Sequence, residues 1–274
     1  SSVEITQQPQ PTETEIQFIL DAIAKYVVVE VRRSDVQSAW SGIRPLAQDP
    51  HAIDTASASR DHIVATSPAD GMITVAGGKW TTYRKMAEDA IDAAVGSGEF
   101  TAITSPCRTM NLPLVGSAGY SRSLFTDVAQ HYVVPHRPGA IDTQVAKYLA
   151  EAYGDRAKMV TRIAEQRKLG RRLVRGHPVI EAEIIYAMHN EMCETPEDFI
   201  ARRTRLAFVD VAATHQALPR IVDLMAEEKG WWRWKKGSEL RRAQKYLDTF
   251  HAKLEDKPDV HAAESASGVS GAKP

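Results

Sequence analysis

The stretch ITVAGGKWTTYRKMAEDAIDAA, residues 73–94, decides the fold of the first third of the chain. It begins as an apolar, β-branched run, breaks at Gly77 and Gly78, and continues with apolar residues at helical spacing. A glycine pair allows a tight turn from a strand into a helix. The first N–H groups of such a helix lack backbone partners and attract anions, and Lys79 adds a full positive charge. Taken alone, the pattern is more often a simple turn in which Thr81 caps the helix.

The residues before this turn predict a helix and several strands. HIVAT (62–66) and MITVA (72–76) flank SPADG, whose Pro, Asp and Gly favour a β-hairpin. Thr12 and Glu15 have the spacing of a capping box, and apolar residues follow at helical spacing, which predicts a helix over about 13–25. VVVEV (27–31) and DVQSAWSGI (35–43) are interpreted as two further strands.

After Gly98 the chain becomes loop-rich and then helical. We expect a helix over 143–154 and a buried stripe of Ile180, Ile184, Ala187 and Met188. Thr195-Pro196-Glu197-Asp198 is typical of a helix start, and helices follow near 196–215, 219–229 and 238–253. The prediction is an α/β domain over 1–100, an all-helical domain over 101–255 and a disordered tail over 256–274, which lacks periodic apolar residues.

Composition excludes several classes of protein. The 274 residues include 34 basic and 35 acidic side chains, so the net charge of -1 argues against a dedicated nucleic-acid binder. Only two cysteines are present, Cys107 and Cys193, without the CxxC spacing of a thiolate metal site. The apolar runs are far shorter than the roughly 18 residues of a membrane-spanning helix.

Three cations could converge on a phosphate. Arg44 in SAWSGIRPL and Arg60 in SRDHIV each lie beside strand-like sequence, a short distance before Lys79. Guanidinium groups offer paired donors that suit phosphate oxygens. The alternative, that both arginines are ordinary surface or ion-pair residues, is equally compatible with the pattern.

Three other features favour structural roles. Arg202, Arg203 and Arg205 are interpreted as ion-pair residues rather than nucleic-acid contacts. His189 and Cys193 are one helical turn apart, but no second pair completes a metal site, so we expect packing. The last feature is an aromatic and basic patch that either contacts lipid or, as we favour, packs on neighbouring helices: Trp231, Trp232, Arg233, Trp234, Lys235 and Lys236.

Four strings together carry a resemblance to a known family: SAWSGIRPL, SRDH, GGKWTTYRKMAEDA and EAEIIYAMHNEMCETPEDFIARRTRLAF. From about residue 13 to 250 the chain resembles the FAD-dependent, quinone-linked glycerol-3-phosphate dehydrogenases. Within that family it most resembles the eukaryotic mitochondrial branch. The resemblance implies oxidation of glycerol 3-phosphate to dihydroxyacetone phosphate. The family's GxGxxG fingerprint is not found here, so the chain resembles the C-terminal part of such an enzyme and is expected to be an incomplete catalyst alone.

The resemblance also implies a site. Arg44, Arg60 and Lys79, with Thr82 as a weaker candidate, would bind the substrate. Gly77 and Gly78 would let the backbone approach the flavin, and the N–H groups around Lys79, Trp80 and Thr81 would stabilise negative charge there, as an oxyanion hole does.

No catalytic residue and no metal ligand is expected within this chain. The resemblance further implies a mitochondrial protein held peripherally at the inner membrane, a quinone as electron acceptor and, as an option, a homodimer. Two other functions stay open: an oxygen-using glycerol-3-phosphate oxidase and a non-catalytic helical interaction module.

Overall fold

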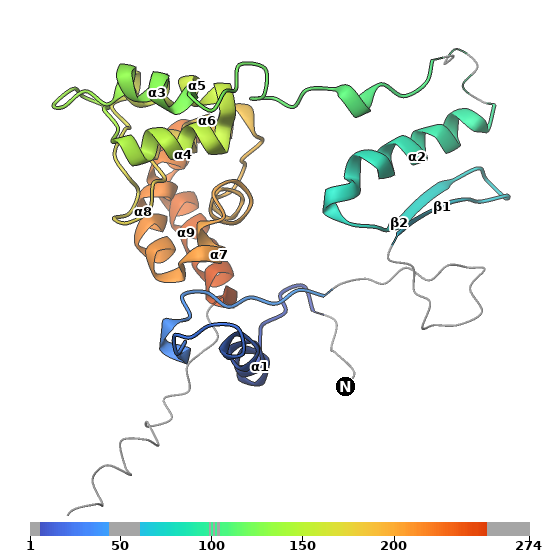
Figure 1. Cartoon of the computed structure of the whole chain (residues 1–274), viewed down its shortest axis with the longest axis horizontal. Coiled ribbons are helices and arrows are strands. Elements are labelled where there is room, and N and C mark those ends of the chain that lie inside the picture. Colours follow the sequence, from blue (N-terminus) through green and yellow to red (C-terminus); the bar gives the residue numbers. More distant parts are fainter. Residues whose placement is uncertain (1–5, 44–60, 99, 101, 103–104, 251–274) are drawn as a thin grey trace, which may run out of the picture. The chain divides into compact units, whose positions relative to one another are not determined.

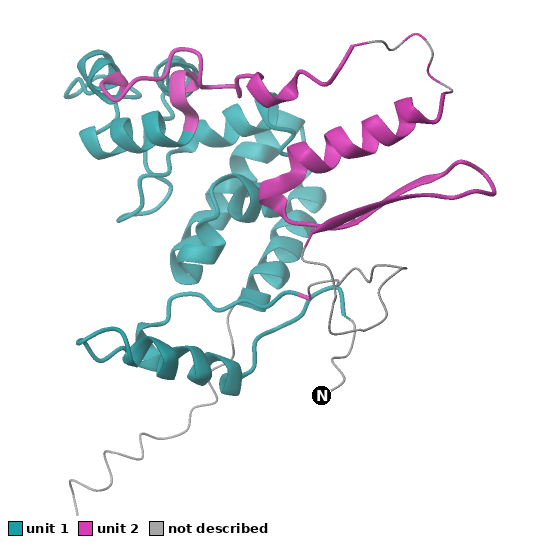
Figure 2. Cartoon of the chain, turned by 45° about the vertical axis from the view of Figure 1, so that its right-hand side comes forward, with its two compact units in different colours: residues 1–42, 125–152, 157–274 teal, residues 43–124, 153–156 magenta. Residues whose placement is uncertain are grey.

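The computed structural model describes residues 6–43, 61–98, 100, 102 and 105–250, and the chain forms two compact units (Figures 1 and 2). Unit 1 comprises Ser1–Gly42, Phe125–Ala152 and Ala157–Pro274, and unit 2 comprises Ile43–Leu124 and Tyr153–Arg156. The domain boundaries expected at residues 100 and 255 stay predictions, and the expected disordered tail over 256–274 lies outside the described residues.

Unit 2 contains the hairpin and the helix that follows it. Strand β1 (His62–Thr66) pairs antiparallel with β2 (Ile73–Gly77), with Val64 opposite Val75. This confirms the predicted hairpin. Helix α2 (Tyr83–Gly96) packs on both strands. On α2, Met86, Ala90 and Ala93 are half-buried, whereas Tyr83 is exposed.

The two further strands predicted before the hairpin are wrong. Residues 27–31 form no strand, and residues 35–43 contain only the end of a 3-10 turn (Arg33–Asp35) followed by irregular extended chain. β-branched sequence alone does not make a strand, because a strand needs a partner for its backbone hydrogen bonds. Within the described residues β1 and β2 form a sheet of two strands, and neither segment joins it.

Unit 1 is helical, which confirms the helical half of the expected architecture. Its core lies around α6 and α8, where Ile184, Leu218 and Ile221 are fully buried. The helices, from blue to red in Figure 1, are α1 Glu13–Ala24, α3 Leu124–Tyr132, α4 Thr143–Tyr153, α5 Ala157–Arg167, α6 Glu181–Asn190, α7 Leu206–Val209, α8 Val211–Lys229 and α9 Arg233–Leu247.

Several helix ends follow the predicted sequence signals. Thr12 and Glu15 form a reciprocal capping box at the start of α1, with the Thr12 N–H donating to Glu15 Oε2 at 2.9 Å. Thr195 and Asp198 exchange the same kind of bonds before a π-helical turn (Asp198–Arg203). Each pair satisfies N–H groups that the helix leaves without partners.

Helix α8 differs from its prediction because it passes through a proline. We expected separate helices over 196–215 and 219–229, but α8 runs unbroken from Val211 to Lys229 with Pro219 inside it. Proline removes one backbone hydrogen bond, which ordinarily ends or kinks a helix. The apolar residues on both sides of Pro219 are fully buried in the core, so tertiary packing holds the helix together there: Ala217, Leu218, Ile221 and Val222.

A buried carboxylate fixes the start of α6. Glu183 is 0% exposed, and its Oε1 accepts the Ile180 N–H at 2.7 Å while Oε2 accepts the Tyr148 hydroxyl at 3.1 Å. Burial, with the Glu183 charge, raises the pKa of Tyr148, so that hydroxyl keeps its proton and donates. A buried carboxylate without hydrogen-bond donors would destabilise the fold. Removing the carboxylate is also destabilising, because the two donors then stay buried without an acceptor.

Glu183→Ala is expected to lower the free energy of unfolding by about 3 kcal/mol, because it leaves two donors unsatisfied and opens a cavity. Urea denaturation measures the loss. The matched control is Glu151→Ala on α4. The Glu151 carboxylate is exposed and makes a long ion pair, 3.9 Å, with Lys147, so its removal should change stability by less than about 0.5 kcal/mol. Equal losses in the two variants would contradict this role for Glu183.

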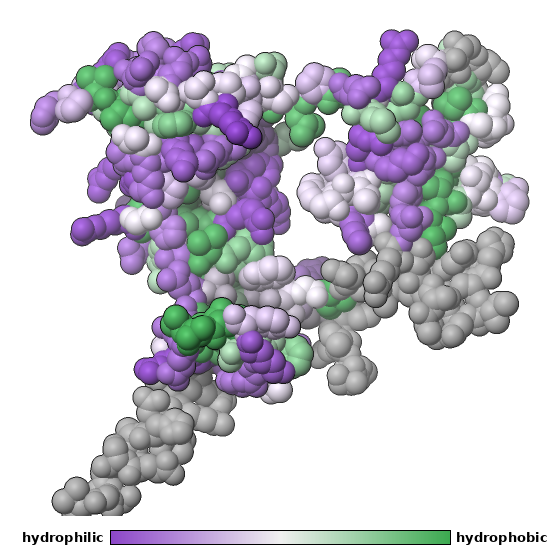
Figure 3. Space-filling view, in the orientation of Figure 1, coloured by the Kyte–Doolittle hydropathy of each residue, from purple (hydrophilic) through white to green (hydrophobic). Residues whose placement is uncertain are grey.

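Apolar side chains remain on the surface near the start of the chain. Phe18 and Ile19 of α1, with Val28 and Val29 after it, are exposed, and green surface gathers over this part of unit 1 in Figure 3. Among the described residues, none of the helices combines the length and apolar character needed to cross a bilayer.

Candidate functional site

The glycine turn joins β2 to α2 in the manner the sequence predicts. Gly77 and Gly78 both have positive φ, at +77° and +76°. A Cβ at Gly78 would lie 2.7 Å from Met86 Sδ and 3.1 Å from His62 Cβ. The positive φ, together with the close approach of Met86 and His62, therefore favours glycine at position 78, a reason that does not depend on a ligand.

The turn then forms a short 3-10 segment, Trp80–Thr82, before α2 begins. The Lys79 N–H donates to Thr82 Oγ1 at 3.2 Å, and the Thr82 hydroxyl donates to the Lys79 carbonyl at 2.9 Å. The Thr82 side chain is thus engaged in holding the turn. A contact between Thr82 and a substrate would have to share this hydroxyl, and its binding role stays a prediction.

The exposed tip of this turn is polar and aromatic. Lys79 is exposed and has no ion-pair partner among the described residues. Trp80 is 88% exposed, with its ring centroid 5.9 Å from that of Tyr83. A tryptophan so exposed on an ordered turn is unusual, since large aromatic side chains are mostly buried. At the head of the 3-10 segment, the Trp80 and Thr81 N–H groups make no hydrogen bond within the described chain.

His62, which was not among the expected site residues, links the hairpin before this turn to the helix after it. His62 on β1 places Nε2 2.7 Å from Asp89 Oδ2 on α2 and Nδ1 3.1 Å from Asp61 Oδ1. Lys85 Nζ lies 2.7 Å from Asp89 Oδ1, and Lys85 and His62 together hold the pKa of Asp89 below its ordinary value. The hairpin and α2 are therefore connected by a side-chain hydrogen bond as well as by packing. The SRDH string contained His62, but nothing in it indicated a partner 27 residues away.

The two arginines proposed for substrate binding, Arg44 and Arg60, lie outside the described residues. Of the four expected substrate residues, the structure thus places Lys79 and Thr82 together on one turn. The five expected flavin contacts, Gly77 to Thr81, are consecutive on that same turn.

Unit 2 also carries a pocket of about 660 Å³ on the side of α2, lined by Ile91 and Val95 and by several residues between Ser105 and Leu114. Arg84 and Cys107 also line it, and Cys107 is exposed with Sγ 3.1 Å from Thr109 Oγ1. Lys79 does not line this pocket, so the pocket does not form part of the candidate site.

The three arginines of FIARRTRLAF each make a different contact within unit 1. Arg202 Nη1 lies 2.9 Å from Asp198 Oδ1, and Arg203 Nε donates to the Glu191 carbonyl at 2.8 Å. The Arg205 guanidinium lies over the Phe208 ring, 5.4 Å from its centroid. Two of the three thus bind acidic or carbonyl oxygens, in line with the structural interpretation, and Arg205 instead packs on an aromatic ring.

His189 and Cys193 make separate contacts. His189 Nε2 lies 2.6 Å from Glu228 Oε1, while Cys193 is buried, and burial raises the pKa of its thiol to about 12. No group of three or more His, Cys, Asp or Glu residues suited to a metal ion occurs within the described part of the chain.

We expected the tryptophan patch to pack on neighbouring helices, and this prediction is wrong for Trp232 and Trp234. Trp232 and Trp234 are 76% and 71% exposed at the start of α9, whereas Trp231 is half-buried. The basic residues beside them are partly neutralised, since Lys235 Nζ lies 2.5 Å from Glu239 and Lys236 Nζ 2.6 Å from Asp223.

Known proteins match both units. Residues 107–236 match the family model described as the C-terminal domain of alpha-glycerophosphate oxidase. Across 91% of the chain, the sequence is 50% identical to the mitochondrial glycerol-3-phosphate dehydrogenase of Arabidopsis thaliana, and across 89% it is 45% identical to that of Homo sapiens. The chain is similar over nearly its whole length to mitochondrial glycerol-3-phosphate dehydrogenases. This confirms the resemblance inferred from the sequence motifs.

A solved structure agrees. The glycerol-3-phosphate dehydrogenase from Bacillus halodurans, complexed with FAD, superimposes on 91% of this chain with a TM-score of 0.66 at 26% identity. The chain spans 40% of the Arabidopsis protein, 33% of the human protein and 47% of the Bacillus chain. The relationship to these dehydrogenases therefore covers nearly the whole of this chain but less than half of theirs.

Proposed function

We propose that this chain is part of an FAD-dependent dehydrogenase that oxidises sn-glycerol 3-phosphate to dihydroxyacetone phosphate and passes the electrons to a quinone. The observation that carries the proposal is the identity of 45–50% to mitochondrial glycerol-3-phosphate dehydrogenases over about nine-tenths of the chain. The FAD complex of the Bacillus relative supports the cofactor. Since those relatives are much longer, the activity belongs to an enzyme of their length.

The residues of the glycine turn fit a flavin site. FAD, when bound, accepts the hydride that leaves C2 of the substrate. The N–H groups of Trp80 and Thr81 are free to donate, and they start a helix whose dipole favours negative charge. In the proposed enzyme these N–H groups would lie at the flavin and would favour negative charge there, as an oxyanion hole does. Gly77 and Gly78 keep side chains away from that surface.

Lys79 is the proposed substrate contact that the structure describes. Its ammonium is exposed and has no carboxylate partner among the described residues, so it is available to an anion. We assign to Lys79, Arg44 and Arg60 the binding of the substrate's phosphate and hydroxyl side, with a lesser part for Thr82. These residues bind and orient the substrate, which places C2 for transfer. No residue of this chain is proposed to take the hydroxyl proton.

Location and partners follow from the relatives' names and from the family resemblance. The names of the plant, human and Dictyostelium discoideum relatives include "mitochondrial", which supports a mitochondrial location for this protein. Peripheral attachment to the inner membrane, quinone as the acceptor and a homodimeric state are proposed on the resemblance alone.

One alternative has a specific observation in its favour. The matching family model is described from an alpha-glycerophosphate oxidase, an enzyme named for a different acceptor. Assays of the full-length gene product with glycerol 3-phosphate, with a soluble quinone analogue or with oxygen alone, separate the two. Quinone reduction that persists without oxygen supports the dehydrogenase. Turnover that depends on oxygen and produces hydrogen peroxide would replace it with the oxidase, and no turnover with either acceptor would favour the non-catalytic module.

A further inference from the structure

His62 lies at the end of the hairpin from which the glycine turn starts. In the register of β1 with β2, His62 is opposite Gly77, the last residue of β2. The His62 side chain is only 9% exposed, and its Cβ lies 3.1 Å from the position that a Cβ on Gly78 would take. The chain therefore leaves the sheet beside this histidine and continues into residues Lys79–Thr82, which we call the exposed turn.

The His62 ring donates a hydrogen bond to α2. Its Nε2 lies 2.7 Å from Asp89 Oδ2. Lys85 and, to a lesser extent, His62 hold the pKa of the Asp89 carboxyl below its ordinary value, so this group is ionised and can only accept hydrogen bonds. The hydrogen is therefore on Nε2. This bond joins residues on the two sides of the exposed turn, 27 positions apart in the sequence.

Helix α2 is fixed to this end of the hairpin by two neighbouring side chains. Met86 and Asp89 are three residues apart, so they lie on the same face of the helix. Met86 Sδ closely approaches Gly78, while Asp89 accepts the bond from His62. Lys85 Nζ lies 2.7 Å from the other oxygen of the Asp89 carboxylate and helps to orient it. The contacts of Met86 and Asp89 therefore fix the place where α2 meets the hairpin.

The exposed turn joins these two fixed elements. Its own hydrogen bonds run between Lys79 and Thr82: the Lys79 N–H donates to Thr82 Oγ1, and the Thr82 N–H and hydroxyl both donate to the Lys79 carbonyl. These bonds close the turn on itself. They do not connect it to β1 or to the body of α2, so the direction in which the turn points depends on how its two ends are held.

We propose that His62 is a positioning residue for the exposed turn and acts through its bond to Asp89. This inference rests on the proposed function, in which the Trp80 and Thr81 N–H groups face the flavin and Lys79 binds the substrate. Donors of this kind are effective when they are held in place before the reaction, and a displacement of about 1 Å can cost about 100-fold in rate. His62 would thus contribute to turnover without touching flavin or substrate.

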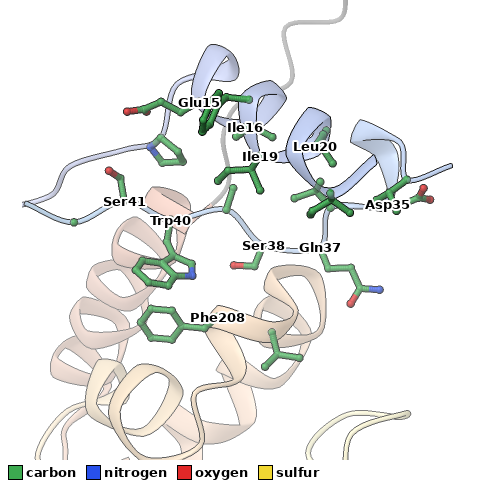
Figure 4. Close-up of a pocket in the computed structure, with 18 residues that line it drawn as sticks. Glu15, Ile16, Ile19, Leu20, Asp35, Gln37, Ser38, Trp40, Ser41 and Phe208 are labelled. Atoms are coloured by element: carbon green, nitrogen blue, oxygen red, sulfur yellow. The ribbon is translucent and has the colours of Figure 1, made fainter. Parts of the chain in front are cut away.

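An aromatic contact in unit 1 provides a control for loss of stability alone. The Trp40 and Phe208 rings meet edge to face with centroids 5.2 Å apart, and Figure 4 shows the Trp40 side chain directed toward Phe208. Both residues line a groove of about 890 Å³, to which none of the residues of the exposed turn contributes. Phe208→Ala should therefore destabilise unit 1 and leave the exposed turn as it is.

Hydrogen exchange in the full-length protein, freed of flavin, tests the positioning without relying on activity. His62→Ala should speed exchange of the amides in residues 77–82 about tenfold, because a hydrogen bond to a charged group is lost beside them. His62→Gln, which can place a donor near Nε2, should restore slow exchange, whereas His62→Asn is too short to reach Asp89 and should behave like His62→Ala. Asp89→Ala replaces His62→Ala should that variant fold poorly. Phe208→Ala should leave exchange in residues 77–82 unchanged.

The flavin-containing enzyme provides a second readout. His62→Ala should shift the flavin absorbance spectrum and lower kcat about tenfold, and His62→Gln should restore both. Adding Asp89→Ala to His62→Ala should have almost no further effect, because the two substitutions remove the same bond.

Three results would overturn the inference and leave the proposed function intact. They are unchanged exchange and an unchanged flavin spectrum in His62→Ala, equal behaviour of His62→Gln and His62→Asn, and an equal rise of exchange in residues 77–82 of Phe208→Ala. A wild-type flavin that glycerol 3-phosphate does not reduce would instead overturn the proposed function, while the exchange data still decide whether His62 holds the turn.

Discussion

Lys79→Ala in the full-length enzyme is expected to raise the KM for glycerol 3-phosphate about 100-fold while the bound flavin content stays the same. Lys79 is an exposed cation without a carboxylate partner among the described residues, so its charge is available for the substrate anion. Removing one member of a desolvated, charge-assisted pair costs about 2–5 kcal/mol, and tenfold in affinity corresponds to about 1.4 kcal/mol. Steady-state kinetics and flavin absorbance measure the two quantities independently.

Two control variants sharpen this experiment. Lys147→Ala removes a cation from α4 that is 63% exposed and lies 3.9 Å from Glu151, and it should leave KM unchanged. Lys79→Arg keeps the charge with different geometry and should recover part of the affinity. A KM and kcat that stay at wild-type values in Lys79→Ala would remove Lys79 from the substrate site.

Gly78→Ala is expected to destabilise the hairpin by about 3 kcal/mol. The substitution combines a positive φ of +76° with a Cβ only 2.7 Å from Met86 Sδ and 3.1 Å from His62 Cβ. The backbone term costs about 1 kcal/mol and the overpacking about 1–3 kcal/mol. Hydrogen exchange of the amides that pair β1 with β2 reports the local opening free energy directly.

Gly71 provides the matched control for this second result. It lies in the turn of the same hairpin with φ +70°, but a Cβ there would meet nothing within 4 Å. Gly71→Ala should therefore show the backbone cost alone, about 1 kcal/mol. Equal losses at the two positions would mean that the contact of α2 with the hairpin does not depend on the small size of residue 78.

The local elements were predictable because their signals are local. The hairpin, the glycine turn and the starts of α1 and the 195–198 segment all depend on residues within a few positions of each other. The strands expected over 27–31 and 35–43 failed for the opposite reason. A β-branched run forms a strand only with a partner, and the described residues supply none, so 36–42 instead binds to helices.

The candidate site was predictable in part for the same reason. The residues of the glycine turn are consecutive, so their proximity followed from the sequence once the turn was recognised. The His62–Asp89 contact and the Trp40–Phe208 contact join residues 27 and 168 positions apart, and no short motif encodes either. SAWSGIRPL contained Trp40, but its periodicity pointed to a strand rather than to an aromatic contact with a distant helix.

The most direct test of the proposed function is an anaerobic titration of the full-length gene product with glycerol 3-phosphate while the flavin absorbance is recorded. The account predicts bound flavin that bleaches on addition of the substrate, with a Lys79→Ala enzyme needing about 100 times more of it. Bound flavin that stays oxidised at saturating glycerol 3-phosphate would contradict the assigned substrate, and a product without flavin would contradict the proposed enzyme altogether.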